Sequence, residues 1–140
     1  MKVDRVLIDT NVIVSGVAFE GNERRLLKLA SEGLIDALLP SFVIAEAEIV
    51  MADKFPHLSV ALRDLLDSLA YEEPPAPPQH LIEQAARLLR DPGDADILAC
   101  AMEVKPDALV TGDKDLLTEE VLSLVPACRC ADYLRKSGYQ

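Results

Sequence analysis

Short apolar segments alternate with helical patterns along most of this chain, and this alternation limits the folds open to it. KVDRVLID (2–9) and DALVTGD (107–113) each contain an apolar run of strand length. NERRLLKLASEG (22–33) instead has helical spacing, with Leu26, Leu27 and Ala30 on one face and Gly33 as a stop. Strands that alternate with helices predict an α/β fold with a parallel sheet.

The remaining segments fit the same scheme. LIDALLP (34–40) and LVPACRC (124–130) predict two more strands, and EEPPAPP (72–78) predicts an extended connector, because its prolines suit neither a helix interior nor a central strand. Further helices are predicted over residues 41–55, 57–70, 79–90, 96–104, 115–123 and 131–137.

The composition agrees with one domain built from helices packed on a sheet. The chain has 140 residues, half of them hydrophobic, with 4% aromatic residues and no Trp, so Leu, Val, Ile and Ala must form the core. We therefore expect residues 1–140 to form a single domain. There is no apolar run near the roughly 18 residues of a membrane span and no signal-peptide pattern, so we expect a cytoplasmic protein without membrane contact.

The charge restricts the partners of the chain. It carries 24 acidic and 14 basic residues, a formal net charge of −10, which opposes broad attraction to phosphate backbones. A nucleic-acid role would therefore need local basic groups or bound cations, whereas a basic protein partner would be attracted. The three cysteines, Cys100, Cys128 and Cys130, suggest neither a disulfide framework nor a complete zinc site.

Two aspartates occupy matching positions at the ends of predicted strands. Asp9 ends VLID, and Asp113 follows ALVTG. The carboxyl ends of parallel strands form the crevice where ligands bind, so the two acids would face each other there if their strands are adjacent. A preference of aspartate for turns is the alternative explanation.

The helix predicted after Ser41 offers two glutamates. At about 100° per residue, Glu46 and Glu48 fall on opposite borders of its apolar stripe. The pattern alone does not choose between them, and either one is also compatible with a solvated flank.

The segment RDPGDADILACA (90–101) divides its aspartates by position. Asp91 before Pro92 is typical of a helix N-cap. Asp94 shares the inward face of the following helix with Ile97, and Asp96 lies on the opposite face. A buried carboxylate needs a partner, so Asp94 is the functional candidate of the three, although an acid also suits a first helical turn.

Several carboxylates in one crevice favour a divalent cation, which relieves their mutual repulsion. Oxygen ligands without His or Cys suit Mg²⁺ or Mn²⁺, and such an ion supports phosphodiester hydrolysis. Other catalytic arrangements have little support. His57 and His80 stand at predicted helix starts, away from the strand ends, and the Gly-containing turns match no nucleotide-binding loop.

The segments VLIDTNVIVSG (6–16), SFVIAEAEIV (41–50), RDPGDADILACA (90–101) and ALVTGDKDLL (108–117) occur in this order. Together they resemble the PIN-domain family, and most closely the PIN-domain toxins of bacterial and archaeal toxin–antitoxin pairs. The resemblance implies a three-layer α/β fold, with a central parallel sheet of about four to five strands flanked by helices. It also implies a metal-dependent endoribonuclease that cuts single-stranded RNA.

The resemblance further implies the composition of the site. It places Asp9, Glu46, Asp94 and Asp113 there as catalytic residues and ligands of one or two Mg²⁺ or Mn²⁺ ions. It also favours Glu46 over Glu48, because the glutamate of the family stands in an Ala-Glu pair early in this helix.

Secondary roles follow from the same resemblance. Asn11 and Thr111 match polar positions that orient the acids or the water, and Asp115 matches a further acid. The strong acidity of the chain is a departure, so RNA contacts must come from local groups. The candidates lie on the helix over 22–33: Arg24, Arg25 and Lys28.

The family further implies three partners: single-stranded RNA, a basic antitoxin that occupies the groove as it folds, and a second copy of the chain in a homodimer. Two other functions remain to be weighed. A PIN-like module could bind metal or RNA without cutting it. A phosphatase with an aspartyl nucleophile would need a second acid two residues after Asp9, where this chain has Asn11.

Overall fold

A parallel sheet of four strands forms the centre of the molecule, in a computed structural model that describes residues 2–139. The strand order is β2-β1-β3-β4, and every pairing is parallel. The two central strands are therefore β1 and β3, which carry the matched acids at their ends. The strands are β1 (Arg5–Ile8), β2 (Asp36–Leu38), β3 (Ala108–Val110) and β4 (Ala127–Cys128).

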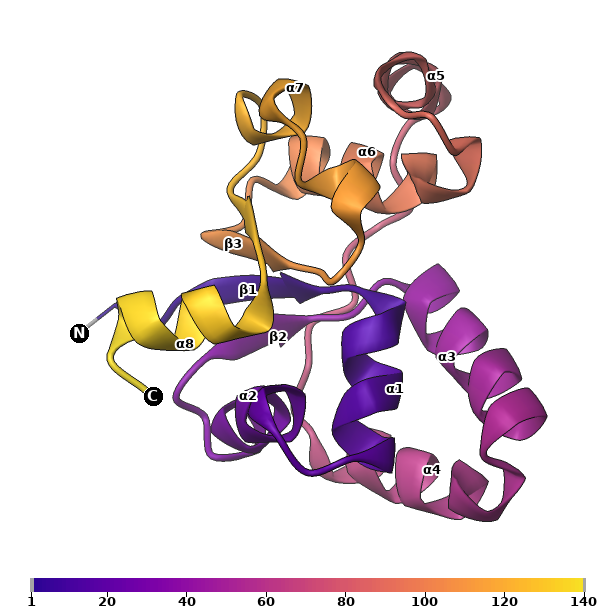
Figure 1. Cartoon of the computed structure of the whole chain (residues 1–140), viewed down its shortest axis with the longest axis vertical. Helices are drawn as coiled ribbons and strands as arrows, with labels where there is room; N and C mark the ends of the chain where they lie inside the picture. The colour runs from indigo at the N-terminus through magenta and orange to yellow at the C-terminus, as the bar shows by residue number, and fades with distance from the viewer. Residues whose placement is uncertain (1, 140) are drawn as a thin grey trace.

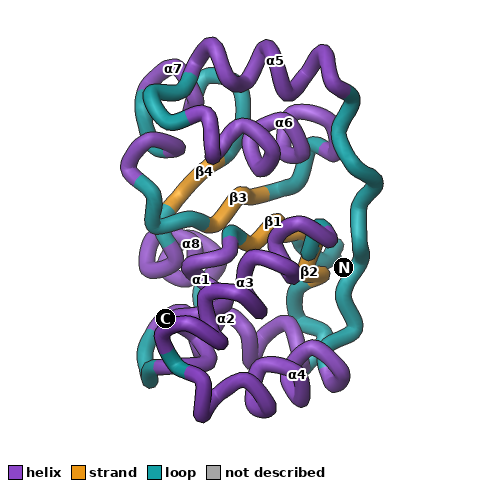
Figure 2. The backbone as a smooth tube through the Cα atoms, turned by 90° about the vertical axis from the view of Figure 1, so that its right-hand side faces the viewer, coloured by secondary structure: helices purple, strands orange, loops and turns teal. Residues whose placement is uncertain are grey.

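Helices cover both faces of this sheet, which confirms the predicted three-layer α/β fold. Figures 1 and 2 show α5, α6 and α7 on one side of the strands and α1 to α4 with α8 on the other. The α-helices are α1 (Thr10–Ala18), α2 (Asn22–Ser31), α3 (Ser41–Lys54), α4 (Ser59–Ser68), α5 (Gln79–Leu88), α6 (Ala95–Val104), α7 (Glu119–Leu122) and α8 (Cys130–Ser137). The 3₁₀ turns are η1 (Pro56–Leu58), η2 (Pro92–Asp94) and η3 (Lys114–Leu116).

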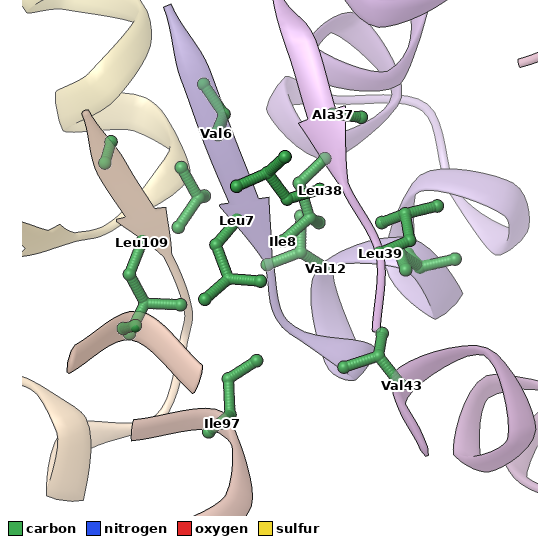
Figure 3. Close-up of a cluster of buried hydrophobic side chains, with 14 of the residues drawn as sticks. Val6, Leu7, Ile8, Val12, Ala37, Leu38, Leu39, Val43, Ile97 and Leu109 are labelled. Atoms are coloured by element: carbon green, nitrogen blue, oxygen red, sulfur yellow. The ribbon is translucent and has the colours of Figure 1, made fainter. Parts of the chain in front are cut away.

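The core lies on both faces of the central strands. Val6, Leu7 and Ile8 are each fully buried, which explains why β1 is apolar without alternation. Leu7 pairs in register with Leu38 on β2 and Leu109 on β3, and Figure 3 shows these side chains close together. Burial of each such side chain stabilises the fold by about 1.5–3 kcal/mol.

The sequence patterns did not predict α1. This helix has no polar stripe, because apolar residues such as Val12, Ile13 and Val14 are buried on most of its sides. The pattern of a helix buried all round is not distinct from that of a buried strand. Gly16 lets α2 pack closely against α1, since a Cβ there would collide with the side chain of Leu27.

The proline-rich segment is an extended connector, as predicted. It leaves α4 and passes the edge of the sheet at Glu72, whose N–H donates to Ala37 O at 2.9 Å and whose carbonyl accepts from Leu39 N at 2.9 Å. It then reaches α5 on the opposite face, a course visible as the long loop in Figure 2. The connector therefore joins the helical layers on the two faces of the sheet.

Several predicted bounds were wrong at their ends. The helix predicted over 57–70 begins with η1, and the helix predicted over 115–123 is interrupted, because Thr118 starts α7 as its N-cap after η3. The strands are shorter than the apolar segments that predicted them, because only the residues that pair with a neighbouring strand belong to the sheet. No helix within residues 2–139 combines the length and the apolarity needed to span a membrane.

Candidate functional site

Asp9 and Asp113 lie at the same edge of the sheet, as predicted from their positions after two strands. β1 and β3 are adjacent and parallel, and Asp9 N–H donates to Val110 O at 3.0 Å where the strands end. The Asp9 carboxylate also caps α1 by accepting from Thr10 N at 2.8 Å. Asp113 in turn caps η3 by accepting from Asp115 N at 2.9 Å.

Thr111 joins these two acids through one hydroxyl group. Its Oγ1 donates to Asp9 Oδ2 at 2.7 Å and accepts from Asp113 N at 3.0 Å. The side chain is fully buried. The hydroxyl therefore sets the orientation of Asp9 and the path of the backbone at Asp113, the kind of orienting position that the resemblance implies for Thr111.

The three aspartates of the 90–101 segment separate as the helical wheel predicts. Asp91 caps η2 by accepting from Gly93 N at 2.9 Å, and Asp96 is exposed. Asp94 stands at the junction of η2 and α6, and its side chain makes no capping bond. Within residues 2–139, Asp94 Oδ2 is buried without a hydrogen-bond partner. Such an atom is costly unless a ligand satisfies it.

Asp115 joins the cluster more closely than the sequence patterns suggested. Asp94, Asp113 and Asp115 each offer a carboxylate oxygen, and these atoms lie within 4.8 Å of one another. Arg90 Nη2 contacts Asp115 Oδ1 at 3.1 Å from an exposed position. The resemblance gave Asp115 a secondary role, as a further acid beside the four, and its distance from Asp94 depends on how η3 packs beside α6.

Burial and crowding change the acidity of the cluster. The pKa of Asp94 is raised to about 7, mainly by burial and then by Asp113, with which a protonated Asp94 can share a hydrogen bond. The pKa of Asp9 is also raised by burial, against the opposing hydrogen bonds from Thr111 and Thr10. Ionised together, these carboxylates repel one another, so the cluster favours a bound cation.

Comparison with known proteins gives a family. The family model described as PIN domain matches residues 5–115. The chain belongs to the PIN-domain family. A comparison with curated proteins finds no match. The PIN-domain fold is also found in solved structures of low sequence identity.

Three of those structures illustrate the likeness of this PIN domain to known folds. PAE2754 from Pyrobaculum aerophilum has a TM-score of 0.69 at 18% identity, covering 99% of this chain and 97% of its own. VapBC2 from Rickettsia felis, solved with a DNA fragment from its promoter, has a TM-score of 0.67 at 16% identity, and the match covers 89% of this chain and 98% of that chain. FitAcB from Neisseria gonorrhoeae has a TM-score of 0.63 at 21% identity, and the match covers 90% of this chain and 98% of that chain.

One pocket of this PIN domain, of about 410 Å³, brings together the four acids that the resemblance implies. Asp9, Asp94 and Asp113 line it from the edge of the sheet, and Glu46 lines it from α3. Glu48 lines a different hollow, between α3 and α4. The two glutamates therefore face different surroundings, a difference that the helical wheel could not supply.

The pocket also contains residues that sequence reasoning missed. Ser15, Phe19, Lys54 and Phe55 line it together with Asn11, which the resemblance had placed near the acids. Three of the missed residues lie at or just beyond the ends of α1 and α3. No sequence pattern predicted them, because the two rings meet only when α1 and α3 pack together.

The basic residues predicted to contact RNA lie elsewhere. Arg24 donates to the carbonyls of Gly16 and Val17 at 3.1 and 3.0 Å, at the end of α1. Arg24 and Lys28 line a hollow between α2 and α4. Neither these two nor Arg25 line the acidic pocket, so their contact with RNA stays a prediction.

The oxygen donors of this PIN domain fit a divalent metal ion. Asp94, Asp113 and Asp115 supply oxygen atoms close enough to share one ion, and the partnerless Oδ2 of Asp94 is the atom that such an ion would satisfy. Oxygen-only donors suit Mg²⁺ or Mn²⁺ rather than zinc. Within residues 2–139 no cysteine belongs to this group of donors. Burial also raises the pKa of Cys100 to about 11 and that of Cys130 to about 12.

Proposed function

We propose that this PIN domain is a divalent-metal-dependent endoribonuclease and the toxin of a toxin–antitoxin pair. The observation that carries the proposal is the buried Asp94 Oδ2, which has no hydrogen-bond partner in the described part of the chain and lies in a pocket with Asp9, Glu46 and Asp113. Bound there, Mg²⁺ or Mn²⁺ would supply the positive charge that activates water and stabilises the leaving oxygen.

Hydrogen bonds within the chain orient two of the four acids. Thr111 orients Asp9, while the N–H of Asp115 orients Asp113, so these carboxylates are preorganised by the fold. Glu46 lies outside the group of Asp94, Asp113 and Asp115 described above. Because Glu46 lines the same pocket as Asp9 and Asp113, its carboxylate would either complete the ligands of the ion, as the resemblance implies, or accept the proton released by the attacking water.

Two kinds of likeness support the toxin assignment. The four sequence motifs resemble those of PIN-domain toxins, and the fold is shared with VapBC2 and FitAcB. We propose a basic antitoxin as the partner, because the net charge of −10 attracts one. A homodimer acting on RNA in the cytoplasm completes the proposal, and sedimentation of the purified chain measures the oligomeric state.

A cleavage assay tests the nuclease. Single-stranded RNA is incubated with the protein and Mg²⁺ or Mn²⁺, using the wild type, Asp9→Asn, Asp94→Asn and Glu46→Gln. We expect metal-dependent cleavage that each substitution lowers at least ~100-fold, a magnitude typical of lost acid–base or electrostatic groups. Glu48→Gln is the matched control, since this glutamate shares α3 but lines another hollow.

Three outcomes would decide against the proposal. Metal-dependent cleavage that survives both Asp9→Asn and Asp94→Asn would show that these acids do not form the catalytic site. Metal binding without cleavage would favour a non-catalytic binding module. Hydrolysis of a phosphate monoester with formation of an aspartyl phosphate would favour the phosphatase, although Asn11 stands where that chemistry needs an acid.

A further inference from the structure

The acidic pocket extends to two aromatic rings and an amine that the proposed reaction does not use. α1 and α3 start near the edge of the sheet and run away from it side by side (Figure 1). Phe19 follows the end of α1, and Lys54 and Phe55 stand at the end of α3. All three side chains line the pocket that contains Asp9. The pocket therefore has an acidic end and an aromatic end.

The aromatic end presents a ring that the fold does not need for its core. The rings of Phe19 and Phe55 meet edge to face, with centroids 5.6 Å apart and an interplanar angle of 88°. Phe55 packs against the core, whereas Phe19 is 57% exposed and lies outside the core cluster. Phe55 therefore supports Phe19, and the exposed ring has surface left for a planar partner.

Lys54 gives the same end of the pocket a positive charge. It is the only Lys or Arg among the lining residues within the described part of the chain. Because the chain carries a net charge of −10, a phosphate can approach this pocket only beside a local cation. A ring beside an ammonium group matches one nucleotide, which offers a flat base and a charged phosphate.

The length of α1 decides which nucleotide this would be. Phe19 follows Asp9 by ten residues, and a rise of 1.5 Å per residue separates them by about 15 Å along the helix axis. A base on Phe19 therefore belongs to a neighbour of the nucleotide whose phosphate reaches the acids. Only an unpaired base can offer a free face to the ring, so a duplex would be rejected.

We propose that Phe19, supported by Phe55 and accompanied by Lys54, is a subsite that stacks an unpaired base of the RNA strand next to the cleaved phosphate. This inference rests on the proposed nuclease function and adds the residues that select single strands. Phe19 contacts the base, Lys54 contacts a phosphate, and Phe55 positions Phe19.

Three fluorescently labelled RNAs separate these roles in anisotropy and cleavage assays. One is a single strand of mixed sequence, the second is the same strand with abasic sites, and the third is the strand paired in a duplex. The variants are Phe19→Ala, Phe19→Tyr and Lys54→Gln, with Ile49→Ala as the control. Ile49 is 70% exposed on α3 but does not line the pocket.

We expect Phe19→Ala to raise Kd and KM for the base-containing strand by about 5- to 150-fold, the range for one stacked base. Phe19→Tyr should bind the base-containing strand as tightly as the wild type does. For the abasic strand, Phe19→Ala and the wild type should have the same Kd. Lys54→Gln should weaken binding to both single strands by the same factor. It should also reduce the salt dependence of Kd by the amount expected for about one phosphate contact. Ile49→Ala should change neither constant.

Two results would overturn the inference while leaving the nuclease intact. If the wild type cleaves RNA and Phe19→Ala binds the base-containing strand as well as the wild type, the aromatic pair belongs to a protein interface. If Phe19→Ala weakens the abasic strand equally, the ring does not stack a base. If the wild type neither binds nor cleaves any of the three RNAs, the proposed function fails and the inference fails with it.

Discussion

Substitution of Thr111 by valine removes the single hydroxyl that joins the acids of β1 and β3. Valine has nearly the same shape, so packing around the side chain changes little. The hydroxyl donates to Asp9 Oδ2 at 2.7 Å and accepts from Asp113 N at 3.0 Å. Thr111 is fully buried, so water does not readily replace either bond.

The expected loss of stability follows from these two bonds. A hydrogen bond to a charged group contributes about 1.5–3 kcal/mol, and a bond between neutral groups about 0.5–1.5 kcal/mol. We therefore expect Thr111→Val to lower the free energy of unfolding by about 2–4 kcal/mol. At about 2–4 °C for each kcal/mol in a chain of this size, Tm should fall by roughly 5–15 °C.

The same change should weaken metal binding. The hydrogen bond from Thr111 lowers the pKa of Asp9 against the effect of burial, so its loss raises that pKa further. A carboxyl group that holds its proton is a poorer ligand, and Mn²⁺ affinity should fall at neutral pH. Urea unfolding followed by circular dichroism measures the first effect, and isothermal titration with Mn²⁺ measures the second.

Thr111→Ser provides the matched control, because it keeps the hydroxyl and loses one methyl group, at a cost of about 1 kcal/mol. If the free energy of unfolding of Thr111→Val lies within about 0.5 kcal/mol of the wild-type value, the hydroxyl does not stabilise the site. If Thr111→Ser is as destabilised as Thr111→Val, the methyl group rather than the hydroxyl matters.

Two further predictions concern the aspartates of the 90–101 segment. The pKa of Asp94 is raised from 3.8 to about 7 in the fold, so the unfolded chain binds fewer protons between these values, and stability without metal should fall as pH rises from about 4 to 7. Urea unfolding in EDTA at pH 5 and pH 8 measures this dependence of the free energy of unfolding on pH. Asp94→Asn should reduce it and Asp96→Asn should not. If both variants show the same pH dependence, Asp94 is not its source. Asp91→Ala should cost about 1 kcal/mol through loss of its cap, and Asp96→Ala less than about 0.5 kcal/mol, so the reverse order in urea unfolding would disprove the division of roles.

Local patterns predicted the parts of the site that lie on single elements. Asp9 and Asp113 could be paired because an acid at the end of an apolar parallel strand always emerges at the same edge of the sheet. Asp91, Asp94 and Asp96 could be separated because a helix turns by a constant angle per residue. The first rule applies to any two parallel strands of one sheet and the second to a single helix, so neither requires knowledge of the whole fold.

Other parts could not be predicted in this way. α1 has apolar residues on most sides, so its periodicity carries no sign of a helix face. Asp115 reaches Asp94 only because η3 packs beside the start of α6. Phe19 and Phe55 meet because the ends of α1 and α3 lie together in the fold, and nothing in the 35 positions between the two residues predicts that contact.

The sequence by itself determined the α/β class, the position of Asp9 and Asp113 after two apolar strands, and the side of the helix on which Asp94 and Asp96 lie. The structure decided that those two strands are central and adjacent. The helical pattern left Glu46 and Glu48 equivalent, and only tertiary structure shows that Glu46 lines the acidic pocket while Glu48 lines another hollow. Tertiary structure likewise brings two rings and Lys54 into that pocket. The reason is physical. Side-chain direction relative to its own element follows from backbone geometry, whereas the surroundings it meets depend on packing between elements distant in the chain.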